Sequence, residues 1–270
     1  MCAQVNTGTM LDRILESRRA EVAHRKKVLP EAALKYGVQA ASPLRDFLGA
    51  LTRPAINVMA ELKPASPSRG VLREPFDPIA LAESLEAAGA VALSVLTEPA
   101  FFQGSLKNLR DARKSVKLPV LRKDFIFDPW QVWEARANDA DSFLLIVLTL
   151  SDAQLNELVT LGRALGMEPL VEVHTREELD RALAAEARII GVNNRNLKTL
   201  EIRTETSLEL VDSIPEDCIA ISESGIRTHG ELLKLRAAGF DAFLIGTRLM
   251  VSSDPATVLA ELLGARAQAT

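Results

Sequence analysis

Short apolar runs recur along the chain at a spacing of roughly 20 to 35 residues. Runs of five to eight mostly apolar residues that are separated by helical patterns are typical of parallel strands covered on both faces. The pattern therefore predicts a repeating strand–helix fold. The predicted strands span residues 56–63, 91–97, 118–123, 143–148, 169–174, 189–193, 218–223 and 242–246.

Residues that begin and end helices fall between these runs. Eight strand–helix units predict a closed (β/α)₈ barrel, since about 250 residues is the usual size of that fold. A doubly wound open sheet is the alternative, but it would require a glycine fingerprint after the first strand, where the chain instead reads ELKPAS. The expected N-caps are Asp128, Ser151, Thr175, Thr228 and Asp254, and the expected C-terminal glycines are Gly89, Gly166 and Gly239.

Residues 1–50 precede the predicted barrel, which spans 51–270. An apolar face at Leu11, Ile14, Leu15 and Val22 predicts a helix over 10–27. Such a helix must pack its apolar face on something, and the open end of the barrel is a candidate. We interpret this segment as an extension of the barrel and not as a separate domain, because it is too short to bury much of a core alone.

Three further features of the extension lead to predictions. Thr9 and Asp12 resemble a capping box at the start of the helix. Pro30, Gly37 and Pro43 are expected to break the segment before a short helix near 44–51. The basic residues at 18–19 and 25–27 are expected to form a solvated face.

Composition adds constraints on class and location. The chain has 270 residues, 47% apolar and 25% charged, with a net charge of −4, so electrostatics give no reason to expect nucleic acid as a partner. No run of 18 uncharged apolar residues is present, and no membrane span is expected. Cys2 and Cys218 form no disulfide framework, and the N-terminus lacks an apolar signal segment. We expect a cytoplasmic protein with reduced thiols, either a monomer or a weak homo-oligomer.

Charged residues lie where several predicted strands end. Alternation of side chains along a strand places Glu61 with Lys63, and gives Lys123, Glu172 and Glu223 the same orientation on their own strands. Each interior layer of such a barrel is filled from alternate strands, so Lys63 is expected to form or crown a single top layer with the last three, with Glu61 nearby. An internal salt-bridge network is the alternative interpretation. Acid–base catalysis is favoured, because buried ion pairs are weak stabilisers and catalytic residues of this fold lie at the C-terminal strand ends.

Glycines follow the last two predicted strands. Gly225 comes after Ser224, and Gly246 comes before Thr247, each at a strand-to-helix turn. In barrels, the loops after strands seven and eight commonly bind phosphate through backbone N–H groups at a short helix. These glycines would otherwise simply allow tight turns. Because both stand in the expected loops, the sequence predicts a small phosphorylated substrate.

Seven segments in order resemble the indole-3-glycerol phosphate synthase family, from the N-terminal helix to the last strand. They are AELK at 60–63 with SPS at 66–68, SVLTE at 94–98 with FQGS at 102–105, LRKDFI at 121–126, EPLVEV at 168–173, GVNNRNL at 191–197, SESGI at 222–226 and LIGT at 244–247. The resemblance implies conversion of 1-(2-carboxyphenylamino)-1-deoxyribulose 5-phosphate to indole-3-glycerol phosphate, with release of carbon dioxide and water, in tryptophan biosynthesis. No metal or organic cofactor is implied.

The resemblance also implies roles in catalysis. Lys123 would be the general acid of ring closure, and Glu172 would be a partner at dehydration. Lys63 would hold the substrate carboxylate or act as the acid in dehydration, with Glu61 assisting proton transfer. Asn193, Glu223 and Ser224 would position substrate hydroxyls and the lysines.

Binding roles follow from the same resemblance. The phosphate contacts carried over are Ser66, Gly225, Gly246 and Thr247, although the last position is more often serine in the family. Pro64 and Ala65 stand where some members have basic residues. Phe102 and Phe125 would line the pocket for the anthranilate ring, and Arg195 would meet the substrate carboxylate or pair with a neighbouring acid.

Two alternative functions are disfavoured by residues of the sequence. A phosphoribosyl-anthranilate isomerase would need a cysteine at the end of the first strand, where Lys63 stands. A non-catalytic phosphosugar-binding protein would have no use for two desolvated lysines beside paired acids. His174 is expected to be a solvated loop histidine.

Overall fold

The computed structural model describes residues 9–265 and contains a closed barrel of eight parallel strands. Strand β1 pairs with β4 on one side and with β10 on the other, so the sheet has no edge. The predicted (β/α)₈ barrel is confirmed, and the open sheet is wrong. The barrel strands are β1 (Asn57–Leu62), β4 (Ala92–Leu96), β5 (Val120–Lys123), β6 (Ser142–Ile146), β7 (Leu170–Val173), β8 (Ile189–Asn193), β9 (Ile219–Glu223) and β10 (Ala242–Ile245).

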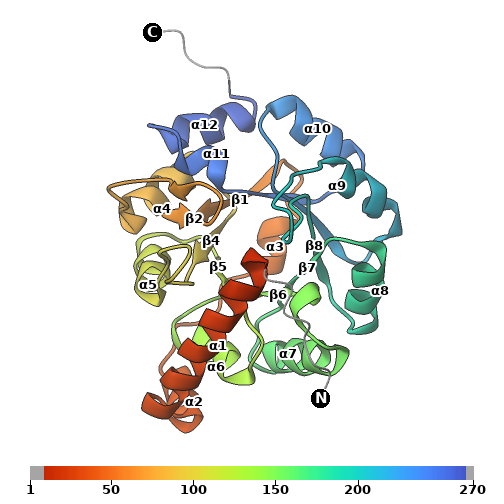
Figure 1. Cartoon of the computed structure of the whole chain (residues 1–270). Coiled ribbons are helices and arrows are strands. Elements are labelled where there is room, and N and C mark those ends of the chain that lie inside the picture. Colours follow the sequence, from red (N-terminus) through yellow and green to blue (C-terminus); the bar gives the residue numbers. More distant parts are fainter. Residues whose placement is uncertain (1–8, 266–270) are drawn as a thin grey trace.

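Helices surround these strands (Figure 1). All five predicted N-caps are confirmed, since each side chain accepts a hydrogen bond from a backbone N–H of the first helical turn. Gly89, Gly166 and Gly239 end helices with φ of 102°, 78° and 115°. The helices are α4 (Pro78–Ala87), α5 (Leu106–Ser115), α6 (Pro129–Ala137), α7 (Asp152–Ala164), α8 (Arg176–Ala184), α9 (Glu205–Leu210), α10 (His229–Ala237), α11 (Thr247–Met250) and α12 (Pro255–Leu262), with short 3₁₀ turns η1 (Val147–Thr149) and η2 (Val211–Ser213).

Three helices precede the barrel: α1 (Met10–Val28), α2 (Glu31–Gln39) and α3 (Phe47–Leu51). The predicted capping box of Thr9 and Asp12 is present. The predicted break at Gly37 is wrong, because α2 continues through it. Helix α2 packs on α6 at this position, where a Cβ on Gly37 would lie in ordinary contact, 3.6 Å from Cβ of Ala137.

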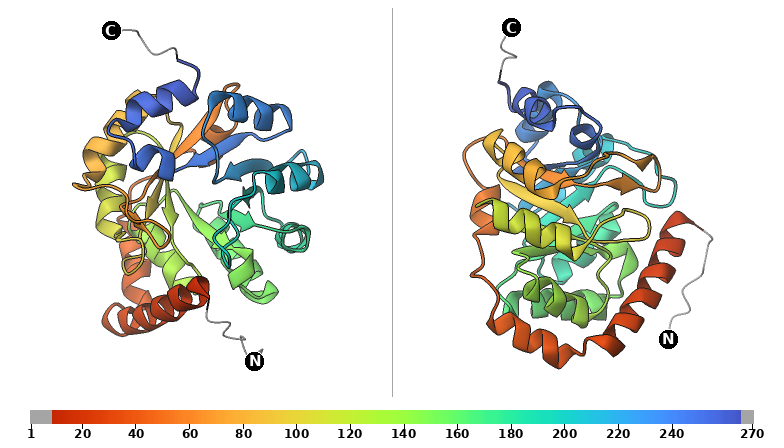
Figure 2. Two further views of the ribbon diagram at one scale, coloured as in Figure 1. Left: turned by 45° about the horizontal axis from the view of Figure 1, so that its top comes forward. Right: turned by 90° about the vertical axis from the view of Figure 1, so that its left-hand side faces the viewer.

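Helix α1 reaches the mouth of the barrel. Leu11, Ile14 and Leu15 are buried against side chains of the barrel interior, so the candidate packing surface predicted for this helix is confirmed. The right view of Figure 2 shows α1 rising along the side where a small hairpin projects. That hairpin, β2 (Ala65–Ser66) with β3 (Gly70–Val71), follows β1 and was not predicted.

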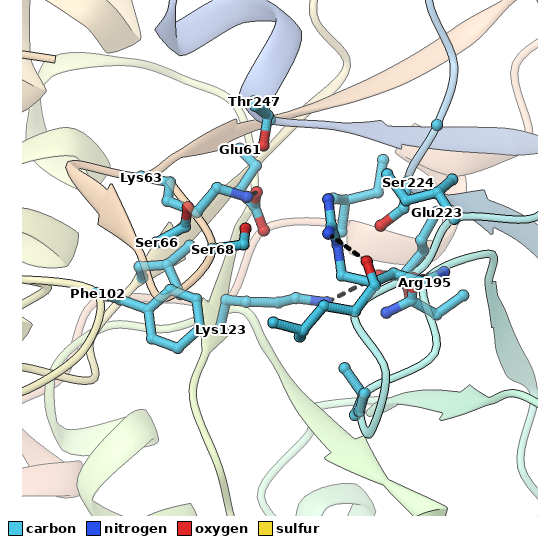
Figure 3. A pocket seen from close by; sticks show the side chains of 18 of the residues that line it. Glu61, Lys63, Ser66, Ser68, Phe102, Lys123, Arg195, Glu223, Ser224 and Thr247 are labelled. Atoms are coloured by element: carbon cyan, nitrogen blue, oxygen red, sulfur yellow. Dashed lines mark hydrogen bonds and ion pairs between the residues drawn. The ribbon is translucent and has the colours of Figure 1, made fainter. Parts of the chain in front are cut away.

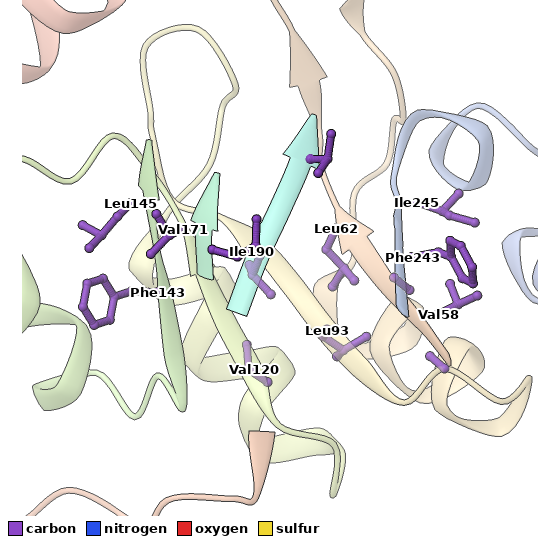
Figure 4. Packing of buried hydrophobic residues seen from close by; sticks show 14 of the residues in the cluster. Val58, Leu62, Leu93, Val120, Phe143, Leu145, Val171, Ile190, Phe243 and Ile245 are labelled. Carbon is purple, nitrogen blue, oxygen red and sulfur yellow. The ribbon is translucent and has the colours of Figure 1, made fainter. Parts of the chain in front are cut away.

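The barrel strands separate two hydrophobic cores. Val58, Ala60 and Leu62 of β1 belong to the larger core between strands and helices, part of which Figure 4 shows. Met59 belongs instead to the smaller core inside the barrel. Since side chains alternate along a strand, Glu61 shares the inward face with Met59. The same alternation turns the charged strand ends of β5, β7 and β9 towards the barrel axis.

No helix in the described range is both long and apolar enough to cross a membrane. Cys218 is free and half-buried just before β9. Cys2 lies outside the described residues.

Candidate active site

A cavity of about 660 Å³ opens at the C-terminal ends of the strands. It is bounded by strand ends, by the loops after β1, β8, β9 and β10, and by the first turns of α1. The structure brings all fourteen predicted site residues to its walls: Glu61, Lys63, Ser66, Phe102, Lys123, Phe125, Glu172, Asn193, Arg195, Glu223, Ser224, Gly225, Gly246 and Thr247.

Lys123 lies at the centre of the polar wall. Its Nζ donates to Oε2 of Glu172 at 2.9 Å and to Oε2 of Glu223 at 2.7 Å. Lys123 and Glu223 end β5 and β9, and Glu172 is the last but one residue of β7, as the predicted top layer requires. Figure 3 shows Lys123 reaching across the pocket towards Glu223. The lysine side chain is 13% exposed, so a bound molecule has access to its ammonium group.

Lys63 lies beside Glu61, the residue with which side-chain alternation grouped it. It stands one residue beyond β1 and pairs with Glu61, and it makes no hydrogen bond to Glu172 or Glu223. Figure 3 shows this pair across the pocket from Glu223. The site therefore has two separate ammonium groups, that of Lys63 beside Glu61 and that of Lys123 between Glu172 and Glu223.

Burial and crowding separate the proton affinities of these groups. Burial alone would lower the pKa of Lys123, but the carboxylates of Glu172 and Glu223 outweigh it and raise the pKa. Burial likewise opposes ionisation of Glu172, but Lys123 and then His174 lower its pKa. Burial raises the pKa of Glu223 to about 7, and the nearby carboxylates oppose the effect of Lys123 there. One lysine shared by two glutamates thus leaves the second glutamate able to exchange a proton near neutral pH.

Gly191 makes room for Glu223, and sequence reasoning did not single it out for this. A Cβ at this glycine would overlap Oε1 of Glu223, so the carboxylate lies directly over the backbone of β8. Gly246 does the same for Glu61, since its Cβ would overlap the Glu61 carboxylate. The only sequence signal was a glycine inside an otherwise β-branched strand.

Asparagines organise the loop after β8. Oδ1 of Asn193 accepts from the backbone N–H of Arg195 at 2.9 Å. The neighbouring Asn194, which was not predicted, donates to the carbonyl of Ser224 at 3.0 Å. Arg195 donates to the carbonyl of Leu200 at 3.0 Å and makes no ion pair with a described acid. Burial lowers the pKa of its guanidinium, which faces the cavity.

The part of the cavity that is lined by Ser66, Gly225 and Thr247 is suited to an anion. The hydroxyl of Ser66 is buried and has no hydrogen-bond partner among the described residues. Gly225 has φ of 87°, and Thr247 begins α11. Three exposed arginines that the motif analysis did not single out also line this end, namely Arg69, Arg227 and Arg248. They supply positive charge despite the apolar residues at positions 64 and 65.

The remaining wall is apolar. The rings of Phe102 and Phe125 lie 6.1 Å apart between centroids, at 42° to each other. Leu11 and Ile14 of α1 and Leu197 of the loop after β8 extend this wall. The cavity thus has a charged wall, an end suited to an anion and an aromatic side.

The basic face predicted on α1 is partly wrong. Arg18 is 1% exposed, and its Nε and Nη2 donate to the two oxygens of Asp124 at 2.9 and 2.7 Å. Nη2 of Arg25 lies 2.5 Å from Oε1 of the buried Glu134. Arg122 joins the two acids, donating to Asp124 at 2.9 Å and to Glu134 at 2.8 Å. Asp124, in the turn after β5, and Glu134, in α6, thus bind arginines of α1, and Arg122 and Asp124 flank Lys123 in the chain.

The prediction that His174 is solvated is also wrong. Its side chain is 10% exposed and lies between Glu172 and Glu178. The residue sits at the turn between β7 and α8, where the chain bends back over the strand end. A histidine in this position is part of the charged wall.

Fold and cavity together define a (β/α)₈-barrel protein with a cluster of lysine and glutamate side chains and an end suited to an anion at its C-terminal face. Solved structures agree on the fold. A 3-hexulose-6-phosphate synthase superposes with a TM-score of 0.62 at 14% identity, covering 78% of this chain and 100% of that one. A mandelate oxidase superposes with a TM-score of 0.60 at 18% identity, covering 87% and 85%. At these identities the likeness shows the fold alone.

Sequence comparison gives the family. Residues 11–262 match the family model described as indole-3-glycerol phosphate synthase. Proteins of that name from Rhodococcus jostii and Mycobacteroides abscessus are 49% and 48% identical, covering 96% and 97% of this chain and 96% of each relative. A third, from a Polaromonas species, is 46% identical, covering 94% of this chain and 98% of that relative. The chain belongs to the indole-3-glycerol phosphate synthase family.

Proposed function

We propose that this protein catalyses ring closure of 1-(2-carboxyphenylamino)-1-deoxyribulose 5-phosphate to indole-3-glycerol phosphate, as a carboxy-lyase of tryptophan biosynthesis. Family membership supports the reaction. The observation that carries the mechanism is the buried contact of Lys123 with both Glu172 and Glu223. It provides a proton donor and two proton acceptors within one hydrogen-bonded group.

Ring closure forms a carbon–carbon bond between the ring carbon that bears the carboxylate and the ribulose carbonyl carbon. The carbonyl oxygen gains a proton as it becomes a hydroxyl, and Lys123 is the donor, because its ammonium group lies at the centre of the cavity floor. Loss of carbon dioxide returns the bonding electrons to the ring. General acid assistance of this kind is typically worth about 10²–10⁴ in rate.

Dehydration removes the new hydroxyl as water, and a proton is lost as the indole ring becomes aromatic. The hydroxyl needs an acid, and the lost proton needs a base. Glu172 and Glu223 stand on either side of Lys123, so protons pass among the three without leaving the cluster. Lys63, paired with Glu61 across the cavity, binds the substrate carboxylate or supplies the second acid.

The two ends of the cavity match the two ends of this substrate. The unpartnered hydroxyl of Ser66, the backbone at Gly225 and Gly246, and the start of α11 at Thr247 bind the phosphate. The arginines around this end increase its positive potential. Phe102 and Phe125 contact the anthranilate ring, which leaves the reacting carbons above Lys123. Arg195 lies where the guanidinium can meet the carboxylate.

The test is to mix purified protein with the substrate and follow indole fluorescence, beside Lys123→Ala and the control Lys107→Ala. Lys107 is an exposed lysine that pairs only with Asp111 on its own helix. We expect turnover by the wild type and by the control, and a loss of kcat of at least about 10²-fold in Lys123→Ala.

Each other outcome has a defined meaning. Binding of substrate by the wild type without turnover would support a phosphosugar-binding protein. Turnover of phosphoribosyl-anthranilate instead would support the isomerase. Full activity of Lys123→Ala would remove this lysine from the mechanism while leaving the reaction in place.

A further inference from the structure

His174 connects two glutamates of different elements. It follows the last residue of β7 and precedes Thr175, the N-cap of α8. Its Nδ1 lies 3.0 Å from Oε2 of Glu178, and its Nε2 lies 3.4 Å from Oε1 of Glu172. The other oxygen of Glu172 is the one that accepts from Lys123. Glu172 thus lies between the imidazole ring and Lys123, the proposed general acid.

The hydrogen bonds determine where the protons of the ring are. Oε2 of Glu178 also accepts the backbone N–H of His174 at 2.8 Å, so this carboxylate is an acceptor and Nδ1 carries a proton. Nε2 of His174 and Oε1 of Glu172 are both buried, and neither makes a hydrogen bond of good geometry with a described residue. The side chain of Asn193 also approaches the Glu172 carboxylate and helps to lower its pKa. A lone pair on Nε2 would place two acceptors face to face 3.4 Å apart, which is costly. A proton on Nε2 turns the same contact into attraction.

The charges around the ring favour that second proton. Glu172 faces it from β7, Glu178 from α8 and Glu223 from β9, while the ammonium of Lys123 lies beyond Glu172. The N-terminal end of α8 opposes a cation, but its partial charge is smaller than that of the carboxylates. Burial would lower the pKa of His174, and the hydrogen bond to Glu178 and the charge of Glu172 raise it above its ordinary value.

We propose that His174 is an imidazolium positioning residue that bridges Glu178 and Glu172 and keeps Glu172 ionised and oriented towards Lys123. Glu172 then has a cation on each oxygen. When Lys123 gives its proton to the substrate, the charge of His174 still holds Glu172 as an acceptor. The inference rests on the proposed function, in which Glu172 takes part in proton transfer.

The charge state is measured without substrate, by a nitrogen-15 NMR titration of the imidazole rings. The chain has three histidines, and His174→Gln removes one set of signals and assigns it. We expect the titration midpoint of His174 to lie above the ordinary value of 6.5, so that both ring nitrogens are protonated in most molecules at pH 6.5. A midpoint at or below 6.5 would overturn the proposal.

Glu178→Gln tests the cause of the charge. Glutamine keeps an oxygen that accepts the backbone N–H but loses the negative charge, so the midpoint of His174 is expected to fall by about one unit. Glu177→Gln is the matched control, because Glu177 lies in the same first turn but is exposed. An equal fall of the His174 midpoint in Glu178→Gln and Glu177→Gln would show that no specific bridge between His174 and Glu178 exists.

The kinetic consequence separates this role from a structural one. In His174→Gln we expect kcat at pH 7 to drop about tenfold, with KM nearly unchanged. Tenfold is the lower end of the activity loss that follows when a residue orienting a functional side chain is removed. In the wild type, kcat is expected to fall as pH rises through the midpoint of His174, and in Glu178→Gln this fall moves to lower pH.

The two proposals fail in different ways. A charged His174 in a protein without turnover would remove the proposed reaction and leave the bridge in place. Normal kcat and an unchanged pH profile in His174→Gln, beside active wild type, would overturn the positioning role alone.

Discussion

At the scale of single residues, space is as important as charge in this site. Glu223 and Glu61 reach their positions because glycines on neighbouring strands leave their side chains room. The charged residues could be predicted from sequence, since a charge at the end of an apolar strand stands out. The glycines could not, because the need for a missing Cβ arises only when β8 and β9 lie side by side.

Gly191→Ala tests the role of this space. The added methyl group must displace the Glu223 carboxylate, which holds Lys123 from one side. We expect kcat to fall about 10²-fold, since a misplacement of about 1 Å in a catalytic group can cost that much.

Gly230→Ala is the control for this substitution. A Cβ at Gly230 would meet nothing within 4 Å, so its activity is expected to match the wild type. Wild-type kcat in Gly191→Ala would mean that Glu223 can move without consequence.

At the scale of elements, α1 is joined to the barrel by charge as well as by its apolar stripe. The stripe could be read from its period, and its burial is confirmed. The inward turn of Arg18 could not, because its partner Asp124 is 106 residues away in the chain and belongs to the turn after β5. Local patterns show which face of a helix is apolar, but not which acids a distant turn will bring to its border.

Arg18→Met is expected to destabilise the protein by about 3–5 kcal/mol, because it leaves the buried Asp124 with less compensation. Neighbouring Arg122 still donates to this carboxylate, so the lower part of the range is expected. Unfolding by urea, followed by tryptophan fluorescence, measures the loss.

Arg13→Met on the same helix is the control, since Arg13 is exposed. We expect its free energy of unfolding to stay within about 0.5 kcal/mol of the wild type, as for ordinary surface substitutions. Equal losses in both variants would mean that the helix, and not the buried ion pair, determines the effect.

At the scale of the whole molecule, periodicity predicted the barrel because eight similar units leave few ways to bury eight apolar strands. It missed α2 and the β2–β3 hairpin, which are formed by close packing on α6 and by a short local pairing. It also predicted that Glu61 and Lys63 lie together. It did not predict that this pair is separate from the cluster of Lys123, Glu172 and Glu223, since Lys63 lies one residue beyond the end of β1.

The stability of the fold should depend on the proton of Glu223. The pKa of about 7 in the folded protein exceeds the ordinary value of 4.5, so the folded state holds a proton that the unfolded chain releases. The stabilisation from this group is complete below pH 4.5 and is lost as pH rises through 7. The difference corresponds to about 3 kcal/mol.

Glu223→Gln removes this dependence. Relative to the wild type, its free energy of unfolding is expected to improve by about 3 kcal/mol between pH 4.5 and 8. Urea unfolding across this range measures it, with Glu186→Gln as an exposed control. A constant difference between wild type and Glu223→Gln at every pH would show that Glu223 ionises normally.

The pairing of β1 with β10 determines when the site can exist during synthesis. Glu61 emerges from the ribosome early, but Gly246, against which its carboxylate lies, comes almost two hundred residues later. Until β10 is made, β1 and β9 are unpaired sheet edges, which are prone to association with other chains. A truncated translation product that lacks the last strand would therefore be an inactive and aggregation-prone species, and not a weaker enzyme.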